Sequence, residues 1–354
     1  MLPKRVVPTR IGIGRRHRAA EAGYSTPWVQ VRGALALISF AHAFPFDPSY
    51  GYSLEALLAV DPPPEPADFG AFWDTRYGRA LEIKPNPRLR VSGETHARFR
   101  THLLEYDSTG GFRISGWLLT PRFGTPRRGF MLGHGYGGIE SPPYDLPRDD
   151  GIYLVPCFRG LGRSQRAPIS ADPNRHVLHD IDSRDNYILG GCVDDVWVGV
   201  SALLLLFPEL AGHVGYLGIS FGGGIGALAM ARDTRIARGH LNLPSFGHQP
   251  LRLSLPSIGS AAAVQRHVAT RIHLRDTLAY YDAAIAAKSI RQPMHVAAAL
   301  FDPAVAPPGQ FAVYNAITGD KRLFVLDAGH FDYPGRTRQE QDLLAQLRTF
   351  FAPL

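Results

Sequence analysis

The feature that most constrains this sequence is the pentapeptide Gly-Ile-Ser-Phe-Gly at residues 218–222. An apolar run leads into it, and small and apolar residues follow it from Gly223 through Met230. This order predicts a strand, a sharp turn and a helix, with the Oγ of Ser220 exposed above the sheet. Glycine on both sides of the serine lets the strand and helix backbones approach closely. The pentapeptide alone is weak evidence, because similar small-residue turns also occur in nucleotide-binding folds.

Downstream of Ser220, the sequence offers an acid and then a histidine, Asp302 and His330. The α/β-hydrolase fold supplies its catalytic triad in this order, with serine first, then an acid, then histidine. Residues 294–301 are apolar apart from one histidine, which predicts a buried strand that brings Asp302 to its C-terminal end. The next apolar run, residues 323–326, is followed by His330. A predicted amphipathic helix comes after it, with one apolar face made of Leu343, Leu344, Leu347 and Phe351. The sequence therefore predicts Ser220, Asp302 and His330 as catalytic residues at one edge of a sheet.

An oxyanion hole needs two donors, and in this fold one is the backbone N–H of the residue after the nucleophile. That residue is Phe221. The second donor comes from an upstream loop, for which His-Gly-Tyr-Gly-Gly at residues 134–138 is the candidate, with the N–H of Tyr136 as the donor. Tyr136 and Phe221, together with Pro244, are also the predicted substrate-binding residues.

With these motifs in place, the sequence from about residue 44 to 351 resembles carbohydrate esterase family seven, the acetylxylan esterases and cephalosporin C deacetylases. The family's Arg-Gly-Gln-Gly motif stands here as Arg-Gly-Leu-Gly at 159–162, and its Gly-x-Ser-Gln-Gly-Gly as Gly-Ile-Ser-Phe-Gly-Gly at 218–223. Its His-Glu pair is His-Phe at 330–331. An N-terminal helix signature and an oxyanion loop also match, at Ala67-Asp68-Phe69, Phe72-Trp73 and His134-Gly135-Tyr136.

Three motif side chains differ from the family, and all three change from polar to apolar: Leu161, Phe221 and Phe331. None of them belongs to the predicted triad. The Phe221 ring is expected to reshape or narrow the acyl pocket that a glutamine borders in the relatives. Arg159 is expected to have a structural role, tying the strand end at Phe158 to loops under the serine turn. The resemblance thus implies a divergent member with its hydrolytic chemistry intact.

The predicted fold is an α/β-hydrolase, a mostly parallel, doubly wound sheet with helices on both faces and an inserted lid. We expect a single domain over residues 43–354, with an N-terminal helical extension and a lid excursion near 243–292 that contains a helix from Leu274 to Ala287. The expected reaction is serine-dependent removal of a small acyl group, acetyl by resemblance, from a carbohydrate or related alcohol, without cofactor or metal. A serine peptidase or amidase, and a non-catalytic binding protein of the same fold, remain alternatives.

The net charge of +7 is concentrated at one end of the chain, because residues 1–42 hold seven Lys and Arg residues against Glu21 alone. The rest is nearly neutral, so nucleic acid is not an expected partner. Residues 1–42 are predicted to be a basic, disordered extension, with a signal peptide as the alternative. The apolar runs are expected to fall short of the ~20 residues of a membrane span, so no membrane partner is expected.

Cys157 and Cys192 lack metal-like spacing and lie in apolar surroundings, which predicts buried, reduced thiols and a cytoplasmic location. Residues 172–195 are rich in aspartate and contain His176 and His179, but they lack a compact ligand pattern, so a solvated loop is expected there and no metal site. The expected partner is a small-molecule ester, and the resemblance implies homo-oligomers, often hexamers.

Overall fold

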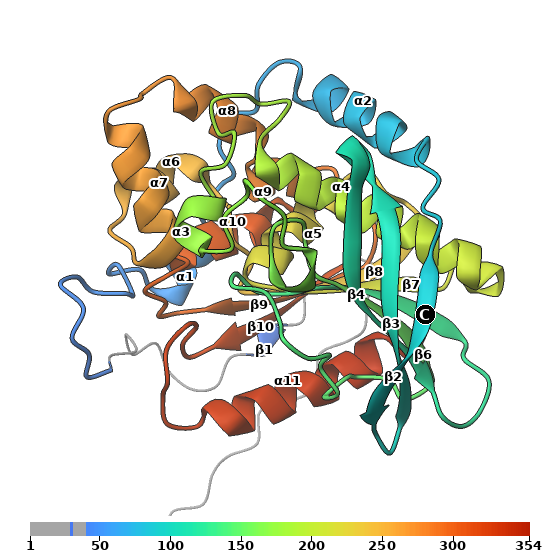
Figure 1. Ribbon diagram of the computed structural model, residues 1–354. Coiled ribbons are helices and arrows are strands. Elements are labelled where there is room, and N and C mark those ends of the chain that lie inside the picture. The colour runs from blue at the N-terminus through green and yellow to red at the C-terminus, as the bar shows by residue number, and fades with distance from the viewer. Residues whose placement is uncertain (1–28, 31–39) are drawn as a thin grey trace, which may run out of the picture.

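The computed structural model describes residues 29–30 and 40–354 (Figure 1). Most of the predicted extension, residues 1–42, lies outside the described residues. One ten-stranded sheet organises the chain in the order β1-β10-β9-β8-β7-β5-β6-β4-β3-β2. Its strands are β1 (Val29–Gln30), β2 (Arg88–Thr95), β3 (Phe99–Ser108), β4 (Phe112–Pro121), β5 (Arg128–Gly133), β6 (Gly151–Pro156), β7 (Val214–Ile219), β8 (Ile236–Asn242), β9 (Met294–Ala299) and β10 (Lys321–Leu326).

The sheet is parallel from β1 across to β6 and antiparallel from β6 through β4 and β3 to β2. Every residue of β5, β6 and β9 is buried, which is why these strands read as apolar runs in the sequence. β7 is central, with Gly218 paired to Gly133 of β5 and Ile219 paired to Asn242 of β8. The C-terminal ends of the parallel strands therefore meet at one edge, where the predicted site residues follow them.

Helices cover both faces of the sheet, as predicted. α11 (Arg336–Phe350) lies on one face, and α4 (Ile188–Leu206) and α5 (Phe221–Met230) lie on the other (Figure 1). The remaining helices of the described chain are α1 (Leu54–Leu58), α2 (Phe69–Leu81), α3 (Pro173–His176), α6 (Gln249–Ser254), α7 (Gly259–Ala269), α8 (Leu274–Tyr280), α9 (Ala283–Ala287) and α10 (Pro307–Ala316).

α4 is the main core helix. It is the one helix of the described chain that is long and apolar enough to span a membrane, so the expectation that no apolar run approaches that length was wrong. Its apolar window is 83% buried inside the protein, so α4 packs in the core. Trp197 of α4 meets Trp73 of α2 edge to face at 6.0 Å between ring centroids, so the N-terminal helical extension packs directly on this core.

The lid excursion differs from the prediction in one respect, because the helix expected over 274–287 is broken into α8 and α9. Asp282 breaks it by capping α9, with its carboxylate accepting the N–H groups of Ala284 and Ile285. The same buried carboxylate accepts N–H groups from His248 at 3.0 Å and Gln249 at 2.6 Å. Burial raises the pKa of Asp282 to about 6 although these donors oppose the shift. The Asp282 carboxylate thus joins the start of the lid, at His248 and Gln249, to α9 near its end.

Candidate active site

Ser220 stands at the turn between β7 and α5, with φ 54° and ψ −112°. A positive φ is strained for a residue with a side chain, and here the packing of the turn enforces it. A Cβ on Gly222 would lie under 3.0 Å from the backbone of Gly133, and one on Gly218 would lie under 3.0 Å from the backbone of Gly222. The two glycines of the pentapeptide are therefore required by the close approach of β5, β7 and α5.

The structure brings Ser220, His330 and Asp302 into one hydrogen-bonded line. His330 Nε2 lies 2.8 Å from Ser220 Oγ, and His330 Nδ1 lies 2.8 Å from Asp302 Oδ2. A carboxylate can only accept, so Nδ1 carries the proton and Nε2 is free to accept the serine hydroxyl. Asp302 follows β9 and His330 follows β10, as the apolar runs of the sequence predicted.

Asp302 is fully buried, and its carboxylate is held from several sides. Oδ1 accepts the backbone N–H groups of Ala304 and Val305, both at 2.9 Å. Oδ2 accepts the side-chain amide of Gln310 at 3.0 Å in addition to the imidazole of His330. Sequence analysis missed Gln310, because a glutamine inside a helix carries no recognisable motif.

The environment of His330 suits a base. Burial alone lowers the pKa of this imidazole, but the charge and the hydrogen bond of Asp302 outweigh burial, so the pKa is raised above its usual 6.5. The side chain remains 27% exposed, whereas that of Asp302 is 0% exposed. Asp302 therefore raises the pKa of a partly exposed imidazole, while its own carboxylate is buried away from solvent.

The predicted oxyanion loop lies directly beside the serine. Gly222 donates its backbone N–H to His134 O at 3.0 Å, and a Cβ on Gly135 would lie 4.0 Å from Ser220 Cβ. His134 Nδ1 lies 2.7 Å from Gly135 O, and its Nε2 accepts the N–H of Phe158 at 3.0 Å. Burial lowers the pKa of His134 to about 4, so a neutral histidine ties this loop to the end of β6.

Two backbone amides near Ser220 remain the candidate oxyanion donors. Phe221 is the first residue of α5, where amides have no acceptor inside the helix. Tyr136 lies next to it, since the two rings stack at 4.1 Å between centroids. The structure thus places both residues together beside the serine, and their donor role stays a prediction.

The side chain of Phe221 corrects the expectation that it borders the acyl pocket. It is 0% exposed and packs in the core, in contact with the rings of Tyr136, Phe158 and Phe246. Pro244 is buried as well, and its Cα would lie 3.0 Å from a Cβ on Gly223. Both residues are therefore buried in the packing around α5, and this burial does not support their predicted substrate contacts.

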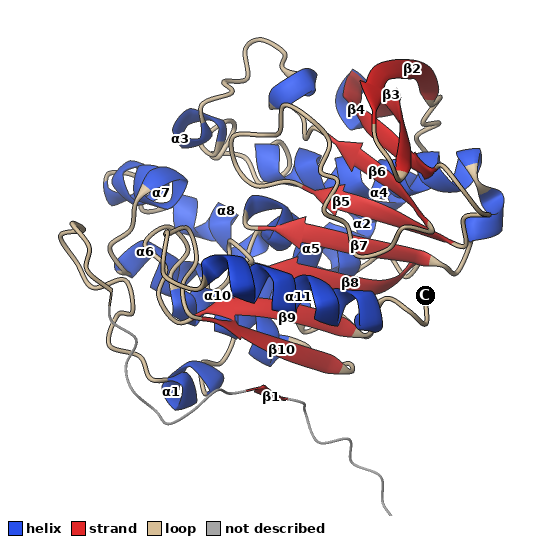
Figure 2. Cartoon of the chain, turned by 90° about the horizontal axis from the view of Figure 1, so that it is seen from below, coloured by secondary structure: helices blue, strands red, loops and turns tan. Residues whose placement is uncertain are grey.

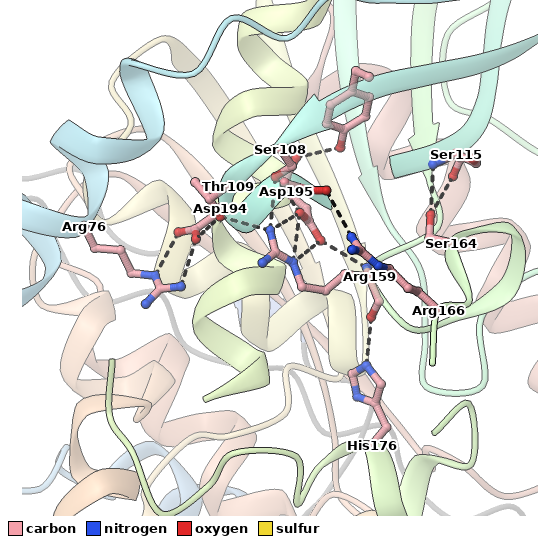
Figure 3. Close-up of polar contacts among 12 residues, drawn as sticks. Arg76, Ser108, Thr109, Ser115, Arg159, Ser164, Arg166, His176, Asp194 and Asp195 are labelled. Carbon is pink, nitrogen blue, oxygen red and sulfur yellow. Dashed lines mark hydrogen bonds and ion pairs between the residues drawn. The ribbon is translucent and has the colours of Figure 1, made fainter. Parts of the chain in front are cut away.

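Arg159 forms a buried polar cluster with side chains of β3, α4 and the turn after β3 (Figure 3). Its guanidinium pairs with Asp195 of α4 at 2.6 Å and also contacts the hydroxyls of Ser108 and Thr109. Although burial opposes it, the charge of Asp195 raises the pKa of Arg159. Arg159 thus has a structural position, as expected, but its main partner is a helix and not a loop.

The cluster reaches Tyr136 through one histidine. His176 Nε2 donates to the carbonyl of Arg159 at 2.9 Å, so its Nδ1 accepts the hydroxyl of Tyr136 at 3.2 Å. Burial lowers the pKa of His176 to about 4, which keeps the ring neutral for this role. His176, which lies in the aspartate-rich segment considered for a metal site, therefore bridges the carbonyl of Arg159 and the hydroxyl of Tyr136. Within residues 29–30 and 40–354, no group of three His, Cys, Asp or Glu side chains could hold a metal ion.

Phe331, the third changed motif residue, belongs to an aromatic cluster beside the triad. Its ring lies 5.0 Å from that of Phe301, the residue before Asp302, and 5.7 Å from that of Phe40. Phe40 also meets Phe301 edge to face at 5.2 Å. The predicted boundary at residue 42 was therefore wrong at this point, because Phe40 already packs on the loops that carry Asp302 and His330.

A family model and several solved structures are similar to this chain. The family model for acetyl xylan esterases matches residues 53–346. Acetyl xylan esterase 1 from Thermoanaerobacterium sp. JW/SL YS485 superimposes with a TM-score of 0.71 at 21% identity, over 83% of this chain and 98% of that one. An acetyl xylan esterase from Paenibacillus sp. R4 gives 0.72 at 21% identity, over 83% and 99%.

A peptidase is also similar in fold. An acylaminoacyl peptidase from Pyrococcus horikoshii superimposes with a TM-score of 0.57 at 13% identity, over 72% of this chain and 42% of that one. At this identity the likeness reports the α/β-hydrolase fold alone and does not favour peptidase chemistry.

Proposed function

The chain belongs to the acetyl xylan esterase family and is a carboxylester hydrolase, and on this premise we propose that Ser220 is its nucleophile, His330 its general base and Asp302 the residue that orients His330. The observation that carries the proposal is the hydrogen-bonded line from Ser220 Oγ through both nitrogens of His330 to Asp302. Serine is a weak nucleophile until a base of this kind accepts its proton.

The geometry supports a two-step reaction. His330 Nε2 takes the proton of Ser220 as Oγ attacks the ester carbonyl carbon, and the resulting oxyanion accepts the N–H groups of Phe221 and Tyr136. His330 then gives the proton to the alcohol oxygen, which leaves as the carbonyl forms again. Water attacks the acyl-enzyme with His330 as base, which releases the acid and restores the serine. Asp302 keeps its charge throughout and stabilises the imidazolium.

We propose acetyl as the acyl group and a carbohydrate, such as xylan, or a related alcohol as its carrier. Family membership supports acetyl, since both acetyl xylan esterases named above are known by that activity. The residues that would contact the alcohol are not fixed by the triad, because fold and triad determine the reaction and not the leaving group.

The experiment measures acetate released from acetylated xylan and from simple acetate esters by the wild-type protein and by Asp302→Asn. The substitution permits the wrong histidine tautomer, so kcat should fall on the order of 10^4-fold. Asp327→Asn and Asp332→Asn are matched controls on the nearby histidine loop and should retain activity. A severe loss in either control, with Asp302→Asn active, would show that the acid has been misassigned.

We propose that the protein forms a homo-oligomer, a hexamer by family resemblance. Light scattering after size-exclusion chromatography measures the mass of the particle and so tests this proposal. We also propose a cytoplasmic location, supported by two buried cysteines that are both free thiols, Cys157 and Cys192.

A further inference from the structure

The loop that carries one of the two proposed oxyanion donors is rich in glycine. Residues 134–138 read His-Gly-Tyr-Gly-Gly, and the last two glycines have φ values of 96° and 82°. Glycine leaves the backbone free to adopt many conformations. The start of the loop is held, because His134 O accepts the N–H of Gly222. Beyond that point, the position of the Tyr136 N–H depends on what holds the Tyr136 side chain.

The side chain of Tyr136 is held at two points. Its ring stacks on the ring of Phe221 at 4.1 Å between centroids, with 30° between the ring planes. Its hydroxyl, at the far end, lies 3.2 Å from His176 Nδ1. The backbone N–H of Tyr136, in contrast, has no hydrogen-bond acceptor within residues 29–30 and 40–354, so it is free to donate to an oxyanion.

His176 is itself anchored to a rigid part of the core. Its Nε2 donates to Arg159 O at 2.9 Å. The N–H of Arg159 donates to Asp195 Oδ2 at 3.1 Å, and its guanidinium pairs with the same buried carboxylate at 2.6 Å. Figure 3 shows His176 and Asp195 on opposite sides of Arg159. A Cβ on Gly160 would lie 3.1 Å from the His176 ring, so the imidazole packs directly on the backbone after Arg159.

The position of His176 in the fold suits a role at the oxyanion loop. His176 ends α3, and Figure 2 shows α3 on the side of the molecule toward which β5, β6 and β7 point, the edge where Ser220 stands. The His176 ring meets the Tyr136 ring at 5.5 Å and the Phe221 ring at 6.1 Å between centroids. Its side chain is 0% exposed, so His176 acts on the reaction only through these neighbours.

We propose that His176 is a positioning residue for the oxyanion hole: by accepting the Tyr136 hydroxyl, it fixes the Tyr136 ring and, with it, the backbone N–H that receives the oxyanion. The inference rests on the proposed function. Stacking on Phe221 alone leaves the ring free to slide parallel to its neighbour, and the flanking glycines do not restrain the backbone. The hydroxyl contact removes this freedom, and an oxyanion donor is effective only when it is aimed in advance.

The expected defect lies in kcat. The negatively charged oxygen forms on the way to both acylation and deacylation but is absent from the bound ester, so a misplaced donor should lower kcat and leave KM nearly unchanged. Loss of a whole donor costs about 10²- to 10³-fold in kcat. Loss of the hydroxyl contact displaces the donor without deleting it, so we expect a fall of at least about tenfold.

Tyr136→Phe tests the contact with the smallest change, because it removes the hydroxyl and keeps the ring. For an acetate ester, kcat should fall at least about tenfold with KM within about twofold of the wild type. The midpoint of the kcat/KM profile against pH should stay unchanged, since His330 and Asp302 are not altered. Tyr153→Phe is the matched control, because Tyr153 is also buried and donates its hydroxyl to Arg148 O at 2.7 Å on β6, and it should keep kcat.

Two substitutions of similar size test His176 itself. His176→Leu and His176→Asn both lose the imidazole, but asparagine keeps an oxygen near the position of Nδ1 that can accept the Tyr136 hydroxyl. Measured per folded active site, kcat should be at least about fivefold lower in His176→Leu than in His176→Asn. Combined with Tyr136→Phe, the two substitutions should give equal kcat, because there is no hydroxyl left to accept. A purely structural role would lower the melting temperature of both variants without this difference in kcat.

Unchanged kcat in Tyr136→Phe, or equal kcat in His176→Leu and His176→Asn, would overturn the inference even if Ser220→Ala is inactive. If neither His176 variant folds, Tyr136→Phe alone decides. Retained activity in Ser220→Ala would instead contradict the proposed function, and the inference with it, so the two failures are distinguishable.

Discussion

Gly329 and Asp302 are so close that a Cβ on the glycine would lie under 3.0 Å from Asp302 Oδ2. Gly329 precedes His330 and donates its backbone N–H to Phe301 O at 2.8 Å, which joins the two loops of the triad. The glycine thus allows the histidine loop to lie against the buried carboxylate.

Gly329→Ala should therefore displace the Asp302 carboxylate from His330. A misplacement of about 1 Å in a catalytic group can lower the rate by about 10²-fold, so we expect a kcat loss of that order for an acetate ester. Gly78→Ala is the control, because a Cβ at Gly78 in α2 would meet nothing within 4 Å. Full activity in Gly329→Ala would show that the carboxylate tolerates the added methyl group.

The raised pKa of His330 predicts the pH dependence of the reaction. Only the neutral imidazole can accept the serine proton, so kcat/KM should rise with pH through the pKa of His330. Because Asp302 raises that pKa above 6.5, the midpoint of the acid limb should lie above 6.5. The measurement uses a substrate without ionisable groups between pH 5 and 9, and a midpoint below 6.5 would contradict the proposed coupling to Asp302.

The burial of Phe221 predicts a stability defect and not a change of specificity. Phe221→Gln should lower the free energy of unfolding by about 3 kcal/mol or more, since it removes a core ring and buries an unpaired amide. The ratio of kcat/KM for acetyl and butyryl esters should stay unchanged in the fraction that folds. Phe221→Leu, which keeps an apolar side chain, should lose less stability. An altered acyl ratio without loss of stability would place the ring in the pocket after all.

Phe40 provides a test of how the N-terminal part of the chain meets the triad loops. Phe40→Ala should lower the free energy of unfolding by about 1–2 kcal/mol, because it removes ring contacts with Phe301, Phe331 and Tyr333. Thermal denaturation measures the effect. Phe123→Ala is the control, since Phe123 is 80% exposed. Equal melting temperatures for the two variants would mean that the Phe40 contacts add nothing to stability.

Sequence reasoning succeeded where a local pattern has a mechanical cause. The serine turn, the apolar strands β9 and β10 and the residues that follow them were predicted at the positions where the structure has them. Strand burial and the need for small residues at a close approach both leave a direct mark on the sequence. For that reason the sequence could predict that Ser220, Asp302 and His330 lie together.

The remainder depended on contacts between distant segments, which leave no local mark. The role of Gln310 follows from its position opposite Asp302. The direction of the Phe221 ring was misjudged because a motif position does not reveal which way a side chain points. The break at Asp282 likewise arises from its contacts with His248 and Gln249.

The central claim is that Ser220 carries the acyl group, and the most direct measurement is turnover of an acetate ester by Ser220→Ala. Circular dichroism and thermal denaturation of the same sample establish that the fold is kept. If Ser220, His330 and Asp302 act as a unit, kcat should fall on the order of 10^6-fold. A folded Ser220→Ala protein that retains turnover within about tenfold of the wild type would contradict the account.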